Sequence, residues 1–160
     1  TNESKWTTSS VGIDTYLSDI ATGVSGDEDV GYTFTGDLDG SDNWEYICTI
    51  DPVNTEGAQV ASTYPAFYLA NIYASYAGLN GTDFADGWYV PTISELYQMY
   101  KNYSTIKSSL KELGISLPYT YDSKLGKYTC RGFWSSSVPS AFGNTAYELD
   151  YYYGEIDNWR

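Results

Sequence analysis

Residues 87–96 constrain the fold more than any other part of the chain, because they join an aromatic stretch to a helix with a defined start. Thr92 stands at the position of an N-cap, and Glu95 follows three residues later, which is the Thr-x-x-Glu capping box. Pro91 favours extended backbone in the residue before it. We therefore predict a short aromatic strand that turns into a helix after Thr92.

A second helix is predicted upstream of this segment. Thr63 matches an N-cap, and Pro65 suits the first turn, where a missing N–H leaves no hydrogen bond unmade. Gly78 is placed to end the helix in the left-handed conformation. Residues at helical spacing give this helix an apolar side formed by Ala66, Leu69, Ala70, Tyr73 and Ala77.

The helix that starts after Thr92 is predicted to turn a corner and continue as a shorter helix over residues 105–113, which Gly114 ends. We expect the longer part to bury Ile93, Leu96, Tyr97, Tyr100 and Tyr103. The shorter part has Ile106, Leu110 and Leu113 on one side.

Strands are predicted on both sides of the helices. Residues 44–50 alternate between apolar and polar, which is typical of a half-buried strand. Residues 119–127 indicate a hairpin, residues 128–134 a strand, and residues 146–151 a strictly alternating strand. A turn at residues 153–155 leads into Ile156.

The order of strands, helices and strands indicates one α+β domain over residues 1–160, with two helical segments packed on a twisted, mostly antiparallel sheet. We expect Trp88, Leu96, Trp134, Leu149 and Ile156 in its core.

Composition narrows the classes of function. The chain has 18 Tyr, 5 Trp, no His and a net charge of −13. Such a charge repels phosphate backbones and anionic lipids, so neither nucleic acid nor membrane insertion is expected. No apolar run is long enough to span a bilayer. Cations or basic partner surfaces fit the charge, although acidity is also a plain device for solubility.

The two cysteines, Cys48 and Cys130, are far apart and show no metal-binding spacing. They either form one disulfide in an exported protein or are buried thiols.

An acidic run offers candidate calcium ligands in Asp37, Asp39 and Asp42, because hard oxygens at alternate positions suit that ion. An EF-hand is excluded, since its sixth and twelfth positions would be Asp42 and Cys48. A looser calcium site and a solvated acidic turn remain as alternatives, and no other cofactor is expected.

Catalytic residues are not predicted. Ser135-Ser136-Ser137 lacks a His to activate a hydroxyl, so we expect these side chains to satisfy backbone groups beside a buried Trp134. Glu148 and Asp150 would face one side of a strand, as a glycosidase pair requires. Acidic residues on an exposed strand face are nevertheless ordinary.

Four short motifs in sequence order resemble a bacterial C-type lectin-like family. That family includes the variable proteins of diversity-generating retroelements and the C-terminal domain of Legionella collagen-like adhesins, with formylglycine-generating enzyme as a distant relative. The resemblance covers residues 54–157 and leaves residues 1–50 poorly matched. Its motifs are Asn-Thr-Glu-Gly-Ala-Gln at 54–59 with Tyr-Pro-Ala at 64–66, Gly-Trp-x-x-Pro-Thr-x-x-Glu-Leu at 87–96, Phe-Trp-Ser-Ser-Ser at 133–137, and Ala146-Tyr147 with Gly154.

The resemblance implies a C-type lectin-like fold and a non-catalytic role, because the paired cysteines of formylglycine-generating enzyme have no counterpart here. It also implies a last strand beyond the turn at Gly154. Because the sequence stops at Arg160, we expect either that the chain is a fragment or that another segment replaces this strand. A bare sheet edge at the C-terminus would favour pairing with another segment or chain.

The C-terminal segment is the candidate binding surface. If Tyr147, Leu149 and Tyr151 point inward, the alternate residues point outward. The outward set mixes stacking faces with hydrogen-bonding groups, as binding surfaces do. In the variable proteins this region contacts ligand. The candidate residues are Phe142, Asn144, Glu148, Asp150, Tyr152, Tyr153, Asp157, Asn158 and Trp159.

These observations predict a recognition or adhesion domain of an exported or phage-borne bacterial protein, on a cell or virion surface, with a protein or glycan as ligand. The alternative is an assembly subunit of a surface appendage, completed by a strand from a neighbour.

Overall fold

The computed structural model describes residues 17–114, 119–122, 127–130, 132–139, 145–151 and 153–159. The first half of the chain forms η1 (Ser18–Ile20), β1 (Thr22–Asp27), β2 (Gly31–Gly36), α1 (Asn43–Ile50), α2 (Gln59–Thr63) and α3 (Pro65–Tyr76). The second half forms α4 (Ile93–Lys101), α5 (Tyr103–Glu112), β3 (Tyr119–Asp122), β4 (Lys127–Cys130), β5 (Phe133–Trp134), β6 (Ala146–Leu149) and β7 (Ile156–Trp159).

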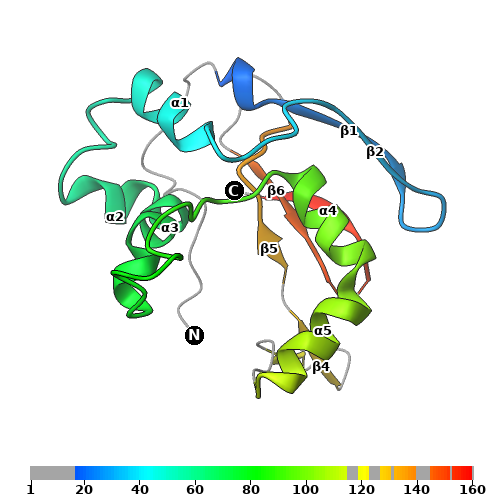
Figure 1. The fold of residues 1–160 in the computed structure, drawn as a ribbon. Coiled ribbons are helices and arrows are strands. Elements are labelled where there is room, and N and C mark those ends of the chain that lie inside the picture. Colours follow the sequence, from blue (N-terminus) through cyan, green and yellow to red (C-terminus); the bar gives the residue numbers. More distant parts are fainter. Residues whose placement is uncertain are drawn as a thin grey trace.

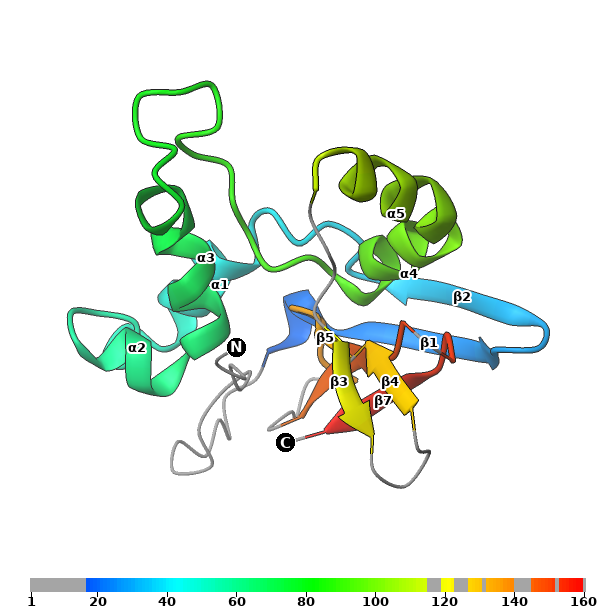
Figure 2. The same ribbon diagram turned by 90° about the horizontal axis from the view of Figure 1, so that it is seen from below.

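The regular elements of the described residues are helices and small antiparallel sheets, which confirms the α+β class. The prediction of one sheet is wrong, because the described strands form three separate sheets. β1 pairs with β2, β3 pairs with β4, and a three-stranded sheet has the order β5-β6-β7. Figure 1 shows α1, α2 and α3 grouped on one side of the molecule, with α4, α5 and the strands on the other. The view from below in Figure 2 shows the same separation.

Two clusters of buried side chains form the core. The first joins η1, α1 and α3 to the start of β6, and consists of Leu17, Ile20, Ile47, Tyr64, Phe67, Val90, Val138 and Ala146. The second lies between α4, the three-stranded sheet and the β1–β2 hairpin, and consists of Ile93, Leu96, Tyr97, Tyr147, Leu149 and Tyr151. Successive residues of a strand point to opposite faces, so β6 gives Ala146 to one cluster and Tyr147 to the other.

The prediction of a strand at residues 44–50 is wrong, because α1 occupies this segment. Asn43 and Ile47 lie one helical turn apart and are both buried. Trp44 and Ile50 also pack against the first cluster, so the helix buries more than one side. Over so few residues, apolar side chains at alternate positions satisfy both a strand and a helix that is covered on two sides.

Pro65 lies in the first turn of α3 as predicted, but the N-cap is Tyr64 rather than Thr63, because Thr63 is the last residue of α2. Gly78 follows the helix with φ at 70°, which confirms its predicted left-handed conformation.

The apolar side of α3 differs in part from the predicted one, although Ala66 and Ala70 pack against the first cluster as predicted. Phe67 and Ala74 are buried, whereas Leu69 and Tyr73 are exposed. Phe67 decides this rotation, since its ring stacks on Trp44 with the centroids 5.3 Å apart. The small alanines along α3 fit either orientation of the helix, and the buried ring of Phe67 determines which one forms.

The capping box of α4 is confirmed. Thr92 Oγ1 accepts a hydrogen bond from the Glu95 N–H at 3.3 Å, and Glu95 Oε2 accepts one from the Thr92 N–H at 2.8 Å. Ile93, Leu96 and Tyr97 are buried as predicted.

Further along, Tyr100 and Tyr103 are only partly buried against the second cluster. α5 starts two residues earlier than predicted and ends before Leu113. Leu113 is exposed, whereas we predicted that it would lie on the apolar side of this helix. Gly114 follows with φ at 70°.

The other strand predictions hold in part. The short aromatic strand predicted before Thr92 is wrong, because residues 88–90 form no strand. β3 and β4 form the predicted hairpin, whose connection at residues 123–126 lies outside the described residues. The predicted strand at residues 128–134 is divided between β4 and β5, which belong to different sheets. Residues after the predicted turn at 153–155 form β7, which pairs with β6.

The predicted core is confirmed for Leu96 and Leu149. Trp134 and Ile156 are partly buried against the two clusters. The prediction for Trp88 is wrong, because 41% of its surface is exposed. Its capping motif begins in a surface loop, where the indole packs on another exposed ring instead of entering the core.

Cys48 is a free, half-buried thiol on α1, and burial raises the pKa of that thiol. The side chain of Cys130 lies outside the described part of β4.

A set of buried polar contacts, here called the polar junction, ties three distant segments together between the two clusters. Its members are Gly40, Asn43, Thr92, Glu95, Ser136 and Ser137. Glu95 Oε2 accepts hydrogen bonds from the N–H groups of Thr92 and Gly40, the second at 3.1 Å. Asn43 Nδ2 donates to Ser136 Oγ at 2.8 Å. The Ser136 N–H in turn donates to Pro91 O at 2.7 Å.

The three serines have the structural role that the sequence predicts. All are fully buried. Ser135 Oγ donates to Tyr147 O at 2.9 Å, and Ser137 Oγ accepts from the Ile93 N–H at 3.1 Å. That N–H belongs to the first turn of α4, which has no partner of its own within the helix.

The space around Gly40 shows how tightly the polar junction is packed. A Cβ at Gly40 would lie 2.6 Å from Val90 O and 2.9 Å from Thr92 N, which are backbone atoms that cannot turn away. We expect Gly40→Ala to lower the free energy of unfolding by about 2 kcal/mol or more, measured by urea denaturation.

Gly23→Ala is the matched control. Its Cβ would approach only the Thr35 hydroxyl, at 2.6 Å, and that exposed side chain can rotate. The control should change the unfolding free energy by less than about 0.5 kcal/mol. Equal losses in the two variants would show that the junction is not close-packed.

Candidate functional site

The C-terminal hairpin, consisting of β6, β7 and the turn between them, carries the predicted binding surface. β6 and β7 pair in the register Tyr147 with Asn158, and Glu148 with Asp157. In the turn, the Asp150 N–H donates to Glu155 O at 2.9 Å. Gly154 has φ at 76°, so the turn favours glycine there.

The inward side of the hairpin is fixed to the second cluster. Tyr147, Leu149 and Tyr151 are buried, as predicted from their alternation. Tyr151 OH donates to Leu96 O at 3.2 Å, which attaches the hairpin to α4. The Ile156 N–H donates to Tyr32 OH at 3.2 Å, so the β1–β2 hairpin holds the start of β7.

Three predicted site residues are exposed together on this hairpin: Tyr153, Asp157 and Asn158. Tyr153 is 40% exposed at the turn, and its N–H donates to Asp150 Oδ1 at 3.2 Å. Asp157 and Asn158 are consecutive residues of β7, so their side chains leave opposite faces of the strand.

Two predicted site residues are less outward than expected. Glu148 is half-buried, because its carboxylate lies across Gly132, where a Cβ would overlap it. Asp150 is half-buried and accepts the turn's hydrogen bond from Tyr153. Both therefore help shape the hairpin.

Four other predicted members lie wholly or partly outside the described residues. They are Phe142, Asn144 and Tyr152, together with the side chain of Trp159, whose backbone is the last residue of β7.

The electrostatics of the turn are acidic. The pKa of Glu155 is raised, first by desolvation and then by the nearby charges of Glu28, Asp157 and Asp150. Glu28 comes from the β1–β2 connection, so two hairpins bring like charges together. This end of the molecule favours a cationic or hydrogen-bond-donating group.

Two of the three candidate calcium ligands, Asp37 and Asp39, accept hydrogen bonds from residues close to them in the chain. Asp37 Oδ2 accepts from Asn43 Nδ2 at 2.8 Å, and Asp39 Oδ1 accepts from the Ser41 N–H at 3.0 Å. Burial raises the pKa of Asp37, whereas the bond from Ser41 lowers that of Asp39. Among the described residues, no three side chains of the metal-binding types gather into a group, Asp42 included.

The structure also reveals an aromatic surface that sequence reasoning missed. Tyr73 and Trp88 are both exposed, with ring centroids 4.4 Å apart. The helical spacing of Tyr73 and the family motif around Trp88 both favoured the core. The available signal was the glycine-rich, acidic stretch at residues 78–87, which is typical of a surface loop.

No helix in the described part of the chain has the length and apolar character needed to cross a membrane. Comparison of the chain with models of protein families, with curated proteins and with solved structures gave no match.

The raised pKa of Glu155 predicts that Glu155→Gln increases the stability of the fold in a pH-dependent way. A raised pKa means that ionisation costs native stability, and this cost is absent below the unfolded pKa of about 4.3 and grows as pH rises. We expect the variant to melt about 1–2 °C higher at pH 7, with no difference at pH 3, measured by circular dichroism.

Glu56→Gln, which changes an exposed loop residue, is the charge-matched control and should show no gain. Salt at 1 M should reduce the part of the gain that comes from charge repulsion, and the part that comes from desolvation should remain. A gain that persists at pH 3 would argue against ionisation of Glu155 as its cause.

Proposed function

We propose that the chain is a non-catalytic recognition domain with a C-type lectin-like fold, carried by an exported or phage-borne bacterial protein. Its ligand would be a protein or glycan surface on a cell or virion, bound through the exposed residues of the C-terminal hairpin. The observation that carries the proposal is the joint exposure of Tyr153, Asp157 and Asn158 on a hairpin whose inner side is fixed in the core.

Rigidity supports this role. The hydrogen bonds from Tyr151 to α4 and from Ile156 to Tyr32 hold the hairpin before any ligand arrives. A pre-organised surface loses less conformational entropy on binding. Tyr153 adds an aromatic face with a hydroxyl, while Asp157 and Asn158 add an acceptor and an amide, the mixture that adaptable binding surfaces use.

The C-type lectin-like assignment is supported by the motifs that the polar junction brings together. The capped helix start at Thr92 and the buried serines at 135–137 are two of the four resembling motifs, and they are hydrogen-bonded to each other. The α+β class is compatible with that family.

The hairpin surface is tested by the variant Tyr153→Ala/Asp157→Ala/Asn158→Ala on arrays of glycans and of bacterial surface proteins. We expect the wild-type chain to bind at least one ligand, and the variant to lose that binding. The melting temperature should stay within a few degrees, because exposed substitutions cost little.

The control variant Tyr68→Ala/Val53→Ala/Leu113→Ala removes exposed apolar side chains that lie outside the hairpin. It should bind as the wild type does. Equal binding by both variants would place the ligand elsewhere, and loss of binding in both would indicate non-specific hydrophobic binding.

A second candidate is an assembly subunit, favoured by one observation. Within the described residues, β7 pairs only with β6 and so forms an edge of the three-stranded sheet. A neighbouring strand added there would complete the sheet. Light scattering over a hundredfold range of concentration should then show growing oligomers, and a constant monomer mass would oppose this candidate.

A further inference from the structure

Exposed apolar side chains gather on the outer side of α3 and on the loop at residues 79–89, where Tyr73 and Trp88 are in contact. Residues 69, 73 and 76 share one face of the helix, and the loop adds two rings. Tyr76 is 78% exposed and Phe84 is 65% exposed. The aromatic surface consists of Leu69, Tyr73, Tyr76, Phe84 and Trp88.

The loop holds its rings in place. Trp88 Nε1 donates to Phe84 O at 2.9 Å, which orients the indole beside Tyr73. The Leu79 N–H donates to Ala74 O at 2.7 Å, and the Phe84 N–H to Thr82 Oγ1 at 3.1 Å. Large exposed side chains held in this way are characteristic of an interaction site.

Charge decides what kind of partner suits this surface. No lysine or arginine lies between Lys5 and Lys101, so the helices α1–α3 and their loops contain no basic side chain. Asp83 and Asp86 are exposed in the same loop as Phe84 and Trp88. Aromatic faces beside carboxylates attract cations both through the ring quadrupole and through charge.

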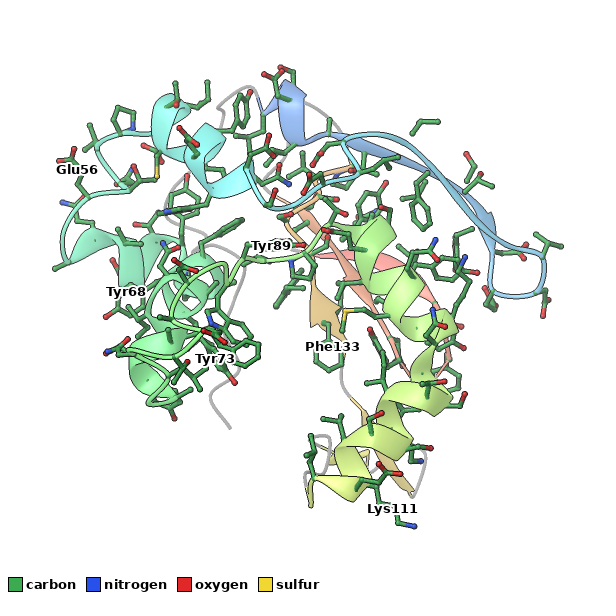
Figure 3. All side chains as sticks on the ribbon, viewed as in Figure 1. Glu56, Tyr68, Tyr73, Tyr89, Lys111 and Phe133 are labelled. Carbon is green, nitrogen blue, oxygen red and sulfur yellow. The ribbon has the colours of Figure 1, made fainter. Side chains whose placement is uncertain are left out.

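The basic residues of the chain lie elsewhere. Lys101, Lys107 and Lys111 are on α4 and α5, and Figure 3 shows Lys111 far from Tyr68 and Tyr73 on α3. Lys101 Nζ lies 5.2 Å from the centroid of the Tyr97 ring, so the chain itself contains a cation–π contact. α3 has no such internal cation nearby in the sequence.

We propose that the aromatic surface is a second binding site, which takes lysine and arginine side chains from a basic segment of a partner protein. The cationic groups stack on Trp88 and Tyr73, and Asp83 and Asp86 supply the opposite charge. Figures 1 and 2 place α3 and the C-terminal hairpin in separate parts of the molecule, so this site does not depend on the hairpin surface.

The test uses three labelled ten-residue peptides, Gly-Arg, Gly-Lys and Gly-Gln repeats, with binding to the full chain measured by fluorescence anisotropy. We expect the arginine peptide to bind best and the glutamine peptide not to bind. Tyr73→Ala/Trp88→Ala should weaken arginine-peptide binding by about tenfold or more through lost cation–π contacts.

Controls separate this site from general attraction to an acidic protein. Trp88→Phe keeps a ring face and should retain most of the binding, which also covers the case in which the double variant unfolds. Tyr153→Ala on the hairpin should leave peptide binding unchanged. Asp83→Asn/Asp86→Asn should weaken binding and reduce its salt dependence.

Three results would overturn the proposal. One is an unchanged affinity in Tyr73→Ala/Trp88→Ala, which would make the attraction purely electrostatic. Another is equal binding of the glutamine peptide. The third is ring-dependent binding of a neutral oligosaccharide such as chitohexaose without binding of the arginine peptide, which would make the surface a glycan site.

Discussion

The carboxylate of Glu95 is the interaction on which the rest of the structure depends. Oε2 accepts from the N–H groups of Thr92 and Gly40, and Oε1 accepts from Tyr89 OH at 2.8 Å. One side chain therefore caps α4, anchors the loop before α1 and orients an exposed tyrosine. A partly buried carboxylate is stable only when such donors replace water. Gly40 is 55 positions from Glu95 in the chain, so the bonds specify tertiary structure as well as a helix start.

The polar junction matters because it lies where two separate core clusters meet. Each cluster is small, and β6 is the strand whose alternate residues enter both. Asn43 joins the loop at residue 37 to Ser136, and Ser136 joins that loop to Pro91. Buried polar groups with every partner in place favour one arrangement over others that would leave them unpaired. The junction thus fixes how the α1–α3 side and the sheet side fit together, and each side presents its own exposed aromatic residues.

Sequence reasoning succeeded where a local rule decides the outcome. The capping box at Thr92, Pro65 in the first turn of α3, Gly78 and Gly114 after helices, and the inward face of β6 all follow from short-range sterics and hydrogen bonding. It failed where tertiary packing chose between equal options. The alternation of residues 44–50 suited a strand, but a helix places Asn43 and Ile47 on one face, where both are buried and Asn43 bonds to Ser136.

The same limit applies to the candidate sites. The exposure of Tyr153, Asp157 and Asn158 follows from the hairpin, whereas the half-burial of Glu148 depends on the distant Gly132. Trp88 was expected in the core because large aromatic residues usually are, and only the rotation of α3 under Phe67 leaves Tyr73 outside to receive its indole. No spacing in the sequence encodes that rotation.

Native-state hydrogen exchange tests the central claim most directly, through four junction amides: Gly40, Thr92, Ile93 and Ser136. If one cooperative set of contacts joins the three segments, these amides open together, with a similar free energy close to that of global unfolding. Gly40 would then be protected although its neighbours Asp39 and Ser41 are exposed. Rapid exchange at Gly40, with Ile93 still protected, would show that α4 is capped without being tied to the loop, and would contradict the account.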